Sequence, residues 1–217
     1  LIISPLLNSC ATQVSVLTNI RTARNSFVKV EAWVGVCSVE ENTCTVPELY
    51  SMGSGAVVFY ANKKAILTAA HVCDLGNAVK FAAGKSKVIL KAIDREGKVH
   101  ETHILKINAK ADICLLNAPL VQAPALKVAV KKPEYGEIVY NISSPLGMSE
   151  GGMVPVFQGL YFGENRGYAH YSIPTIGGSS GSPILNVKGE LVGMIHSVHY
   201  RFHHIFLSAT HTDLWNF

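Results

Sequence analysis

The sequence predicts an all-β fold. Short runs of apolar and β-branched residues recur along the 217 residues, and Gly, Pro, Asn and Asp clusters separate them. Such runs between turn signals are typical of strands. With 48% apolar and 16% charged residues, the composition is that of a compact globular chain rather than a disordered one. Many short strands in one chain of this length favour a β-barrel or a β-sandwich.

The expected elements follow in order along the chain. Residues 11–26 mix polar and β-branched residues with two arginines and predict an N-terminal arm with a short helix. Gly53-Ser54-Gly55 predicts a turn that leads into a buried strand. Three prolines between Asn117 and Pro133 predict a connection without regular structure. Strands are expected at residues 27–36, 55–60, 64–68, 79–81, 88–93, 102–107, 113–116, 137–142, 153–161, 168–172, 182–186, 191–196 and 204–208.

Charge and composition narrow the classes of partner. The net charge is +4, and the lysines are scattered, with no basic tract interleaved with aromatic residues. We therefore expect no nucleic-acid partner. No apolar stretch approaches the length of a membrane-spanning helix. His199 and His203 stand four residues apart, but no Cys-x-x-Cys accompanies them, so we expect neither a metal site nor a cofactor.

The cysteines and the first residues leave the cellular location open. The apolar start runs into Leu7-Asn8-Ser9-Cys10, which resembles a lipoprotein site with Cys10 as the lipid-bearing residue; a membrane is expected as a partner only in that case. A processed viral polyprotein is the other explanation of this start. Cys37 and Cys44 flank a polar loop that a disulfide could close in an oxidising compartment. Cys73 and Cys114 are expected as small core residues, with a bridge between them as the alternative.

The most informative segment is Thr175-Ile176-Gly177-Gly178-Ser179-Ser180-Gly181-Ser182-Pro183. Glycine at 178 and 181 permits backbone conformations that side chains would forbid. The turn can then expose the Ser180 hydroxyl beside the N–H groups of Gly178 and Ser180. Two converging N–H groups are what an oxyanion hole requires.

Two upstream segments supply the partners that such a serine needs. Apolar residues 65–67 lead through Thr68-Ala69-Ala70 into His71, and Asp112 precedes the apolar run 113–116. A serine hydroxyl needs an adjacent base, and the base needs a third group that fixes its tautomer. The sequence therefore predicts a catalytic set of His71, Asp112 and Ser180.

These three motifs, in this order, resemble those of the chymotrypsin-like (trypsin-fold) serine peptidases, from about Phe27 to the C-terminus. The resemblance implies two six-stranded antiparallel β-barrels with the triad between them, and a short C-terminal helix. Residues 1–26 would be the arm and residues 27–217 the peptidase unit, with barrels at about 27–118 and 134–217. It also implies a serine endopeptidase that cleaves polypeptides through an acyl-enzyme. A degenerate fold that serves as a binding or structural module is the alternative.

The branch of the family is less sharply indicated. Ser179 stands where the digestive members carry an aspartate, which argues against activation by insertion of a new N-terminus. Gly53-Ser54-Gly55 resembles the high-temperature-requirement peptidases, here without an expected PDZ module. The context of Thr175 and of His196-Ser197 resembles the viral or phage-type enzymes, which we favour.

The substrate pocket follows from the branch. In the viral-type enzymes a threonine and a histidine read a Gln or Glu side chain. Thr175, His196 and Ser197 are therefore predicted to bind substrate. In the alternative, His196 belongs to the strand core or contacts Asp112, and a small apolar pocket remains.

Overall fold

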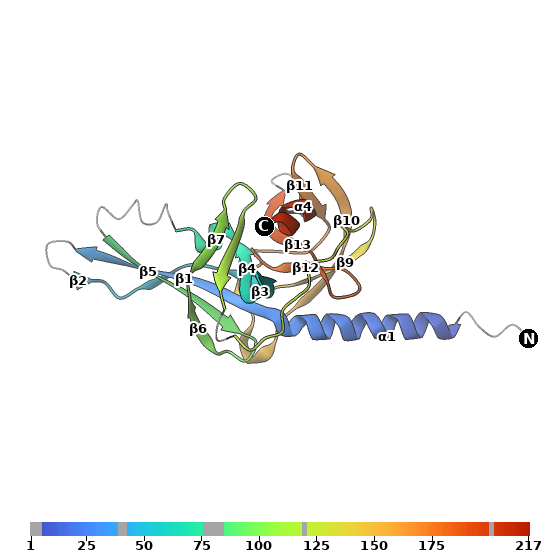
Figure 1. Ribbon diagram of the computed structural model, residues 1–217, viewed down its shortest axis with the longest axis horizontal. Helices are drawn as coiled ribbons and strands as arrows, with labels where there is room; N and C mark the ends of the chain where they lie inside the picture. Colours follow the sequence, from blue (N-terminus) through green and yellow to red (C-terminus); the bar gives the residue numbers. More distant parts are fainter. Residues whose placement is uncertain (1–5, 39–42, 76–84, 119–120, 200–201) are drawn as a thin grey trace, which may run out of the picture.

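The computed structural model describes residues 6–38, 43–75, 85–118, 121–199 and 202–217. Figure 1 shows two β-units side by side, a long N-terminal helix that extends away from them, and an arm of strands on the opposite side. The all-β class is confirmed. The strand expected at residues 79–81 lies outside the described residues.

The first half of the chain forms one antiparallel sheet. Its strand order is β6-β5-β1-β3-β4-β8-β7, and β2 pairs with β1, so the sheet has eight strands. The long strands β1 and β5 pair from Val28↔Asp94 to Cys37↔Lys85 and build the protruding arm. The strands are β1 (Phe27–Ser38), β2 (Thr43–Cys44), β3 (Glu48–Tyr60), β4 (Lys63–Ala69), β5 (Lys85–Asp94), β6 (Val99–Thr102), β7 (Ile104–Asn108) and β8 (Ile113–Asn117).

This sheet differs in detail from the closed six-stranded barrel that the resemblance implied. One strand was expected at residues 102–107, but β6 ends at Thr102 and β7 begins at Ile104. Asn117 lies at the break: the Thr102 hydroxyl and the His103 N–H both donate to its side-chain oxygen, at 2.8 Å each. The Asn117 N–H in turn donates to the His103 carbonyl at 3.0 Å. The His103 N–H is therefore bound by a side chain and not by the backbone of a neighbouring strand. Within the described residues the sheet is a half-barrel whose path ends at β6 and β7.

The second half forms a closed barrel in the order β10-β11-β14-β13-β12-β9. Alternation of buried and exposed residues is clear in β10, where Gly159 and Tyr161 are buried between exposed neighbours, as expected when one face of a strand points into a core. The strands are β9 (Ile138–Ile142), β10 (Val156–Asn165), β11 (Tyr168–Tyr171), β12 (Pro183–Leu185), β13 (Leu191–His199) and β14 (Phe202–Ser208).

Helices are few and mostly short. Helix α1 packs on the units in its C-terminal part, where Ile20 and Ala23 are buried, Val16 packs against the core, and the Asn19 side chain donates to the Val187 carbonyl. Among the described residues, no helix is long and apolar enough to span a membrane. The Cys10 side chain lies outside the described residues, so its lipidation stays a prediction. The helices are α1 (Leu6–Ala23), η1 (Arg24–Ser26), α2 (Ala70–Cys73), η2 (Pro145–Gly147), η3 (Glu150–Gly152) and α4 (His211–Asn216).

The C-terminal helix α4 begins with a capping box. The Thr210 hydroxyl accepts from the Asp213 N–H at 3.1 Å, and the Asp213 carboxylate accepts from the Thr210 N–H at 3.2 Å. Two N–H groups at the start of the helix are thereby satisfied. The capping box therefore stabilises the start of α4, the short C-terminal helix that the resemblance implied.

Two apolar clusters form the core. One fills the barrel around Tyr171, Ile184 and Phe206. The other lies under the first sheet and also includes barrel residues such as Leu191 and Met194. Because this other cluster contains residues of both the sheet and the barrel, its packing holds the loops between the two units at a fixed spacing.

Candidate active site

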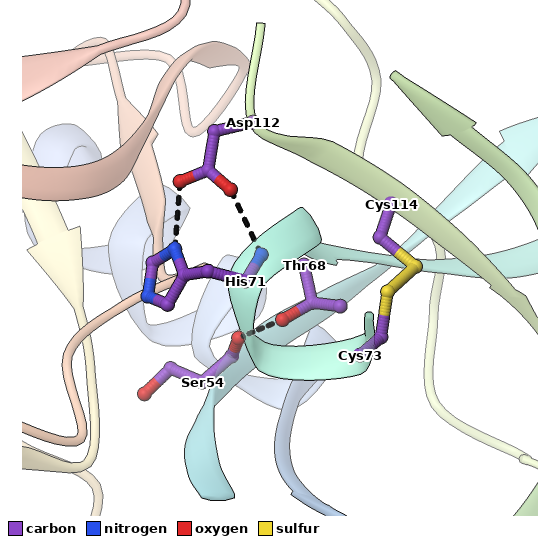
Figure 2. Close-up of a disulfide and its surroundings, with 6 residues drawn as sticks. All are labelled: Ser54, Thr68, His71, Cys73, Asp112 and Cys114. Carbon is purple, nitrogen blue, oxygen red and sulfur yellow. Dashed lines mark hydrogen bonds and ion pairs between the residues drawn. A yellow bond between two sulfur atoms is a disulfide. The ribbon is translucent and has the colours of Figure 1, made fainter. Parts of the chain in front are cut away.

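His71 and Asp112 lie together between the two units. The Asp112 carboxylate accepts from the His71 backbone N–H at 2.9 Å and lies 2.7 Å from the His71 ring nitrogen Nδ1. Figure 2 shows both contacts, one to each carboxylate oxygen. The carboxylate therefore fixes the imidazole in place and leaves Nε2 as its free nitrogen. This is the arrangement that a base on a serine hydroxyl requires.

Local backbone structure explains why these two side chains meet. Strands β4 and β8 pair in the register Ala69↔Ile113, which brings the residues just beyond them into contact. The Ala70 N–H also donates to the Asp112 carbonyl at 3.1 Å. Asp112 has a φ of 55°, a left-handed conformation that aspartate tolerates better than most residues. The strain is held by three hydrogen bonds from residues 70 and 71.

A disulfide ties the same two segments together. Cys73 and Cys114 stand two residues beyond His71 and Asp112, and they are bonded across a sequence separation of 41. Both are buried, so they are core residues and a bridge at the same time (Figure 2). The second disulfide, Cys37–Cys44, closes the β1–β2 turn in the arm.

Three serines stand in the glycine-rich turn, and their burial separates them. Ser179 is 1% and Ser182 is 0% exposed, whereas Ser180 is partly exposed. The Ser182 hydroxyl accepts from the Asn141 side chain at 2.7 Å and is thereby occupied. Of these three serines, only Ser180 is not buried. In the described part of the chain no hydrogen bond joins it to His71, and such contacts often tighten only when substrate binds.

The turn also orients two backbone N–H groups. The Gly177 carbonyl accepts from the Leu146 N–H at 2.7 Å, and the Ser179 carbonyl accepts from the Ser182 N–H at 3.0 Å. In a trans peptide the N–H of the next residue points opposite to the carbonyl. The N–H groups of Gly178 and Ser180 are therefore held in fixed directions, and within the described residues neither has an acceptor.

Glycine is required at two places in this turn. Gly178 has a φ of 92°, and a Cβ there would lie 2.5 Å from the Ser144 carbonyl oxygen. Gly181 has a φ of 84°, and a Cβ there would overlap the Ser54 carbonyl and the Thr68 hydroxyl. Both the backbone conformation and the space exclude a side chain. Gly181 thus lets the turn pack against the first sheet, and Gly178 lets it pack against the barrel loop at Ser144.

His196, on β13, contacts the aspartate rather than lying apart from it. Its Nδ1 is 3.5 Å from the Asp112 carboxylate, its side chain is 11% exposed, and its ring lies against Tyr168 with 5.2 Å between centroids. Its Nε2 is buried and has no partner within the described residues. Thr175 and Ser197 are partly exposed. The substrate-binding role of these three residues stays a prediction, and this contact favours the alternative for His196.

The pKa of His196 is shifted by burial and by its two charged or titratable neighbours. Burial lowers the pKa of His196 from 6.5; Asp112 opposes the shift and His71 adds to it. The other shifted groups are in the barrel core, where burial raises the pKa of Tyr161 to about 12 and that of Tyr171 well above its usual value. His196 therefore stays neutral near pH 7, beside an Asp112 carboxylate that also holds His71.

No metal-ligating cluster of three or more His, Cys, Asp or Glu occurs among the described residues. The side chains of His199 and His203 lie outside them.

Comparison with known proteins identifies the family. A family model for the trypsin-like peptidase domain matches residues 53–194, which is more than half of the chain. The chain belongs to the trypsin-like peptidase family. The domain is 24% identical over 161 residues to a protein of Synechocystis sp. named "Putative serine protease HhoB", a match that covers 68% of this chain and 35% of that protein.

The fold likeness is broader than the sequence likeness. The crystal structure of the serine endoprotease from Yersinia pestis matches this peptidase domain with a TM-score of 0.69, at 20% identity, over 93% of this chain and 64% of that one. The resemblance to chymotrypsin-like serine peptidases is confirmed. The domain spans about a third of the length of its Synechocystis relative. Both relatives are bacterial proteins, and the viral or phage branch stays a prediction.

Proposed function

We propose that this domain is a serine endopeptidase in which His71, Asp112 and Ser180 form the catalytic triad. The observation that carries the proposal is that the Asp112 carboxylate makes two contacts with His71, one with the backbone N–H and one with the ring nitrogen Nδ1. It is supported by the partial exposure of Ser180 between two buried serines.

In the proposed mechanism each group has one task. His71 Nε2 takes the proton of the Ser180 hydroxyl as its oxygen attacks the scissile carbonyl. The N–H groups of Gly178 and Ser180 bind the resulting oxyanion. The imidazolium, stabilised by Asp112, then gives its proton to the leaving amine, and the acyl-enzyme forms on Ser180. A water molecule activated by His71 hydrolyses the ester and restores the serine.

The experiment that tests this proposal uses Ser180→Ala. Loss of a triad nucleophile costs on the order of 10⁶-fold in turnover, so we expect neither peptide hydrolysis nor labelling by a fluorophosphonate probe. Ser179→Ala is the matched control, because the Ser179 hydroxyl is adjacent and buried and has no hydrogen-bond partner in the part of the chain that the structure describes. It should keep labelling. Retained activity in Ser180→Ala would contradict the assignment.

The alternative function, a binding module built on a degenerate peptidase fold, predicts a different result. The parent domain would then fail to react with the probe although it is folded. The free N–H groups of Gly178 and Ser180 favour the enzyme, because a module that only binds has no need of a preserved anion site.

For substrate preference, we propose that the His196 side chain interacts with Asp112 and does not bind substrate. The pocket for the substrate side chain is then small and apolar. With Nδ1 facing the carboxylate, the neutral ring offers only a lone pair at Nε2. Recognition of a Glu side chain would need a protonated His196, which its lowered pKa disfavours. Recognition of Gln through its amide N–H, with Thr175 and Ser197 at the same pocket, stays the competing prediction.

A further inference from the structure

Ser54 is a fully buried serine in β3, on the first sheet, whose hydroxyl reaches the barrel side of the site. It donates to the Gly178 carbonyl at 2.8 Å and accepts from the Ser144 N–H at 2.9 Å. These partners are 124 and 90 residues away in the sequence. The hydroxyl therefore joins two barrel loops through one buried group.

The backbone of Ser54 also forms hydrogen bonds at this position. Its N–H donates to the Ser180 carbonyl at 2.7 Å, and its carbonyl accepts from the Thr68 hydroxyl at 2.8 Å. Figure 2 shows the second contact and shows the Ser54 side chain pointing away from Thr68. One residue of the first sheet thus holds the carbonyls of both Gly178 and Ser180.

The bonds fix the two peptide units on either side of the Gly178 α-carbon. The Ser54 hydroxyl holds the carbonyl of Gly178 directly. The carbonyl of Gly177 is held by the Leu146 N–H, in the loop that starts at Ser144, whose N–H the same hydroxyl holds. Gly178 has no side chain to restrict rotation of these peptides. Without the hydroxyl, two bonds would still oppose that rotation: the one from the Leu146 N–H to the Gly177 carbonyl, and the one from the Ser179 N–H to the Ile176 carbonyl at 3.0 Å. The hydroxyl is the group that joins the Gly178 carbonyl to the first sheet.

We propose that Ser54 is a positioning residue that aims the Gly178 N–H into the oxyanion hole. The inference rests on the proposed function and adds a residue that touches neither substrate nor reacting atoms. A donor placed even about 1 Å away from its target can cost on the order of 10²-fold in rate. The effect should fall on transition-state stabilisation and not on the protonation of His71, since Ser54 makes no contact with that ring in the described residues.

The test is Ser54→Ala, measured as the second-order rate of fluorophosphonate labelling across pH. We expect a rate about 10²-fold below that of the parent, with the acid midpoint of the pH profile unchanged. On peptide substrate the loss should appear in kcat with KM nearly constant. Ser143→Ala is the matched control: Ser143 is also 0% exposed, and its hydroxyl has no hydrogen-bond partner among the described residues. It should label like the parent.

Several outcomes would overturn the inference. They are a Ser54→Ala rate within a factor of about two of the parent, an equal loss in Ser143→Ala, and a moved acid midpoint. If Ser54→Ala fails to fold, Ser54→Cys keeps the shape of the side chain with a somewhat larger atom and replaces the hydroxyl by a weaker S–H donor; labelling as fast as the parent would then refute the role. A folded parent that does not label would refute the proposed function itself.

Discussion

Replacing Cys73 and Cys114 by alanine removes the bridge between the His71 segment and the strand after Asp112. The bridge spans a sequence separation of 41, for which the chain-entropy relation gives about 4 kcal/mol of stabilisation. The bridge between Cys37 and Cys44 spans only 7 residues, and the same relation gives about 2.4 kcal/mol. The double alanine variant at 73 and 114 should therefore lose about 1.6 kcal/mol more than the variant at 37 and 44. Loss of two buried sulfur atoms adds to this difference.

Urea unfolding without reductant, followed by tryptophan fluorescence, measures both losses. Thiol titration of the unfolded parent checks the premise: of the five cysteines, four are bridged, so one thiol should react. Three reactive thiols, or a smaller loss for the variant at 73 and 114 than for the variant at 37 and 44, would refute the reasoning. The folded variant should still react with the fluorophosphonate probe, because the hydrogen bonds between His71 and Asp112 do not depend on the bridge.

Two further predictions concern the side chains around Asp112. Asp112→Asn keeps the shape but stabilises the wrong tautomer of His71, so turnover should fall about 10⁴-fold with unchanged near-UV circular dichroism; a loss of less than about tenfold would argue against the triad. His196→Leu should lower turnover and leave the residue preference of a peptide library unchanged, whereas a changed preference would favour substrate recognition by His196. Because burial lowers the pKa of His196 from 6.5, the folded parent binds fewer protons there than the unfolded chain, and its free energy of unfolding falls as pH drops below 6.5. This decrease in the free energy of unfolding at acid pH, measured by urea unfolding, should be smaller in His196→Leu. An equal decrease in both proteins would contradict the assignment of the effect to His196.

Much of the site could be predicted from the sequence because its parts are local. A glycine with a positive φ, such as Gly178 or Gly181, is required by the turn in which it stands. A single carboxylate at the start of an apolar strand, as at Asp112, needs a partner whichever strand it pairs with. Such features depend on residues a few positions apart, which the sequence displays directly.

The order of His71, Asp112 and Ser180 was also readable, but their distances were not. It is the register of β4 against β8 that brings the Asp112 carboxylate to His71. A shift of one residue would turn these side chains to the other face.

Only the tertiary structure decided the contacts between distant segments. Ser54 was predicted as part of a turn before a strand, and this was wrong, because Ser54 lies inside β3 and pairs with Lys29 of β1. Nothing near it in the sequence indicates its bonds to Gly178 and Ser144. The contact of His196 with Asp112 likewise depends on where β13 passes the start of β8, which Asp112 directly precedes. The sequence by itself determined the residue types and their local conformations. The packing of sheet against barrel determined which buried polar groups meet, because each such group must find its partner wherever the folded chain brings one within reach.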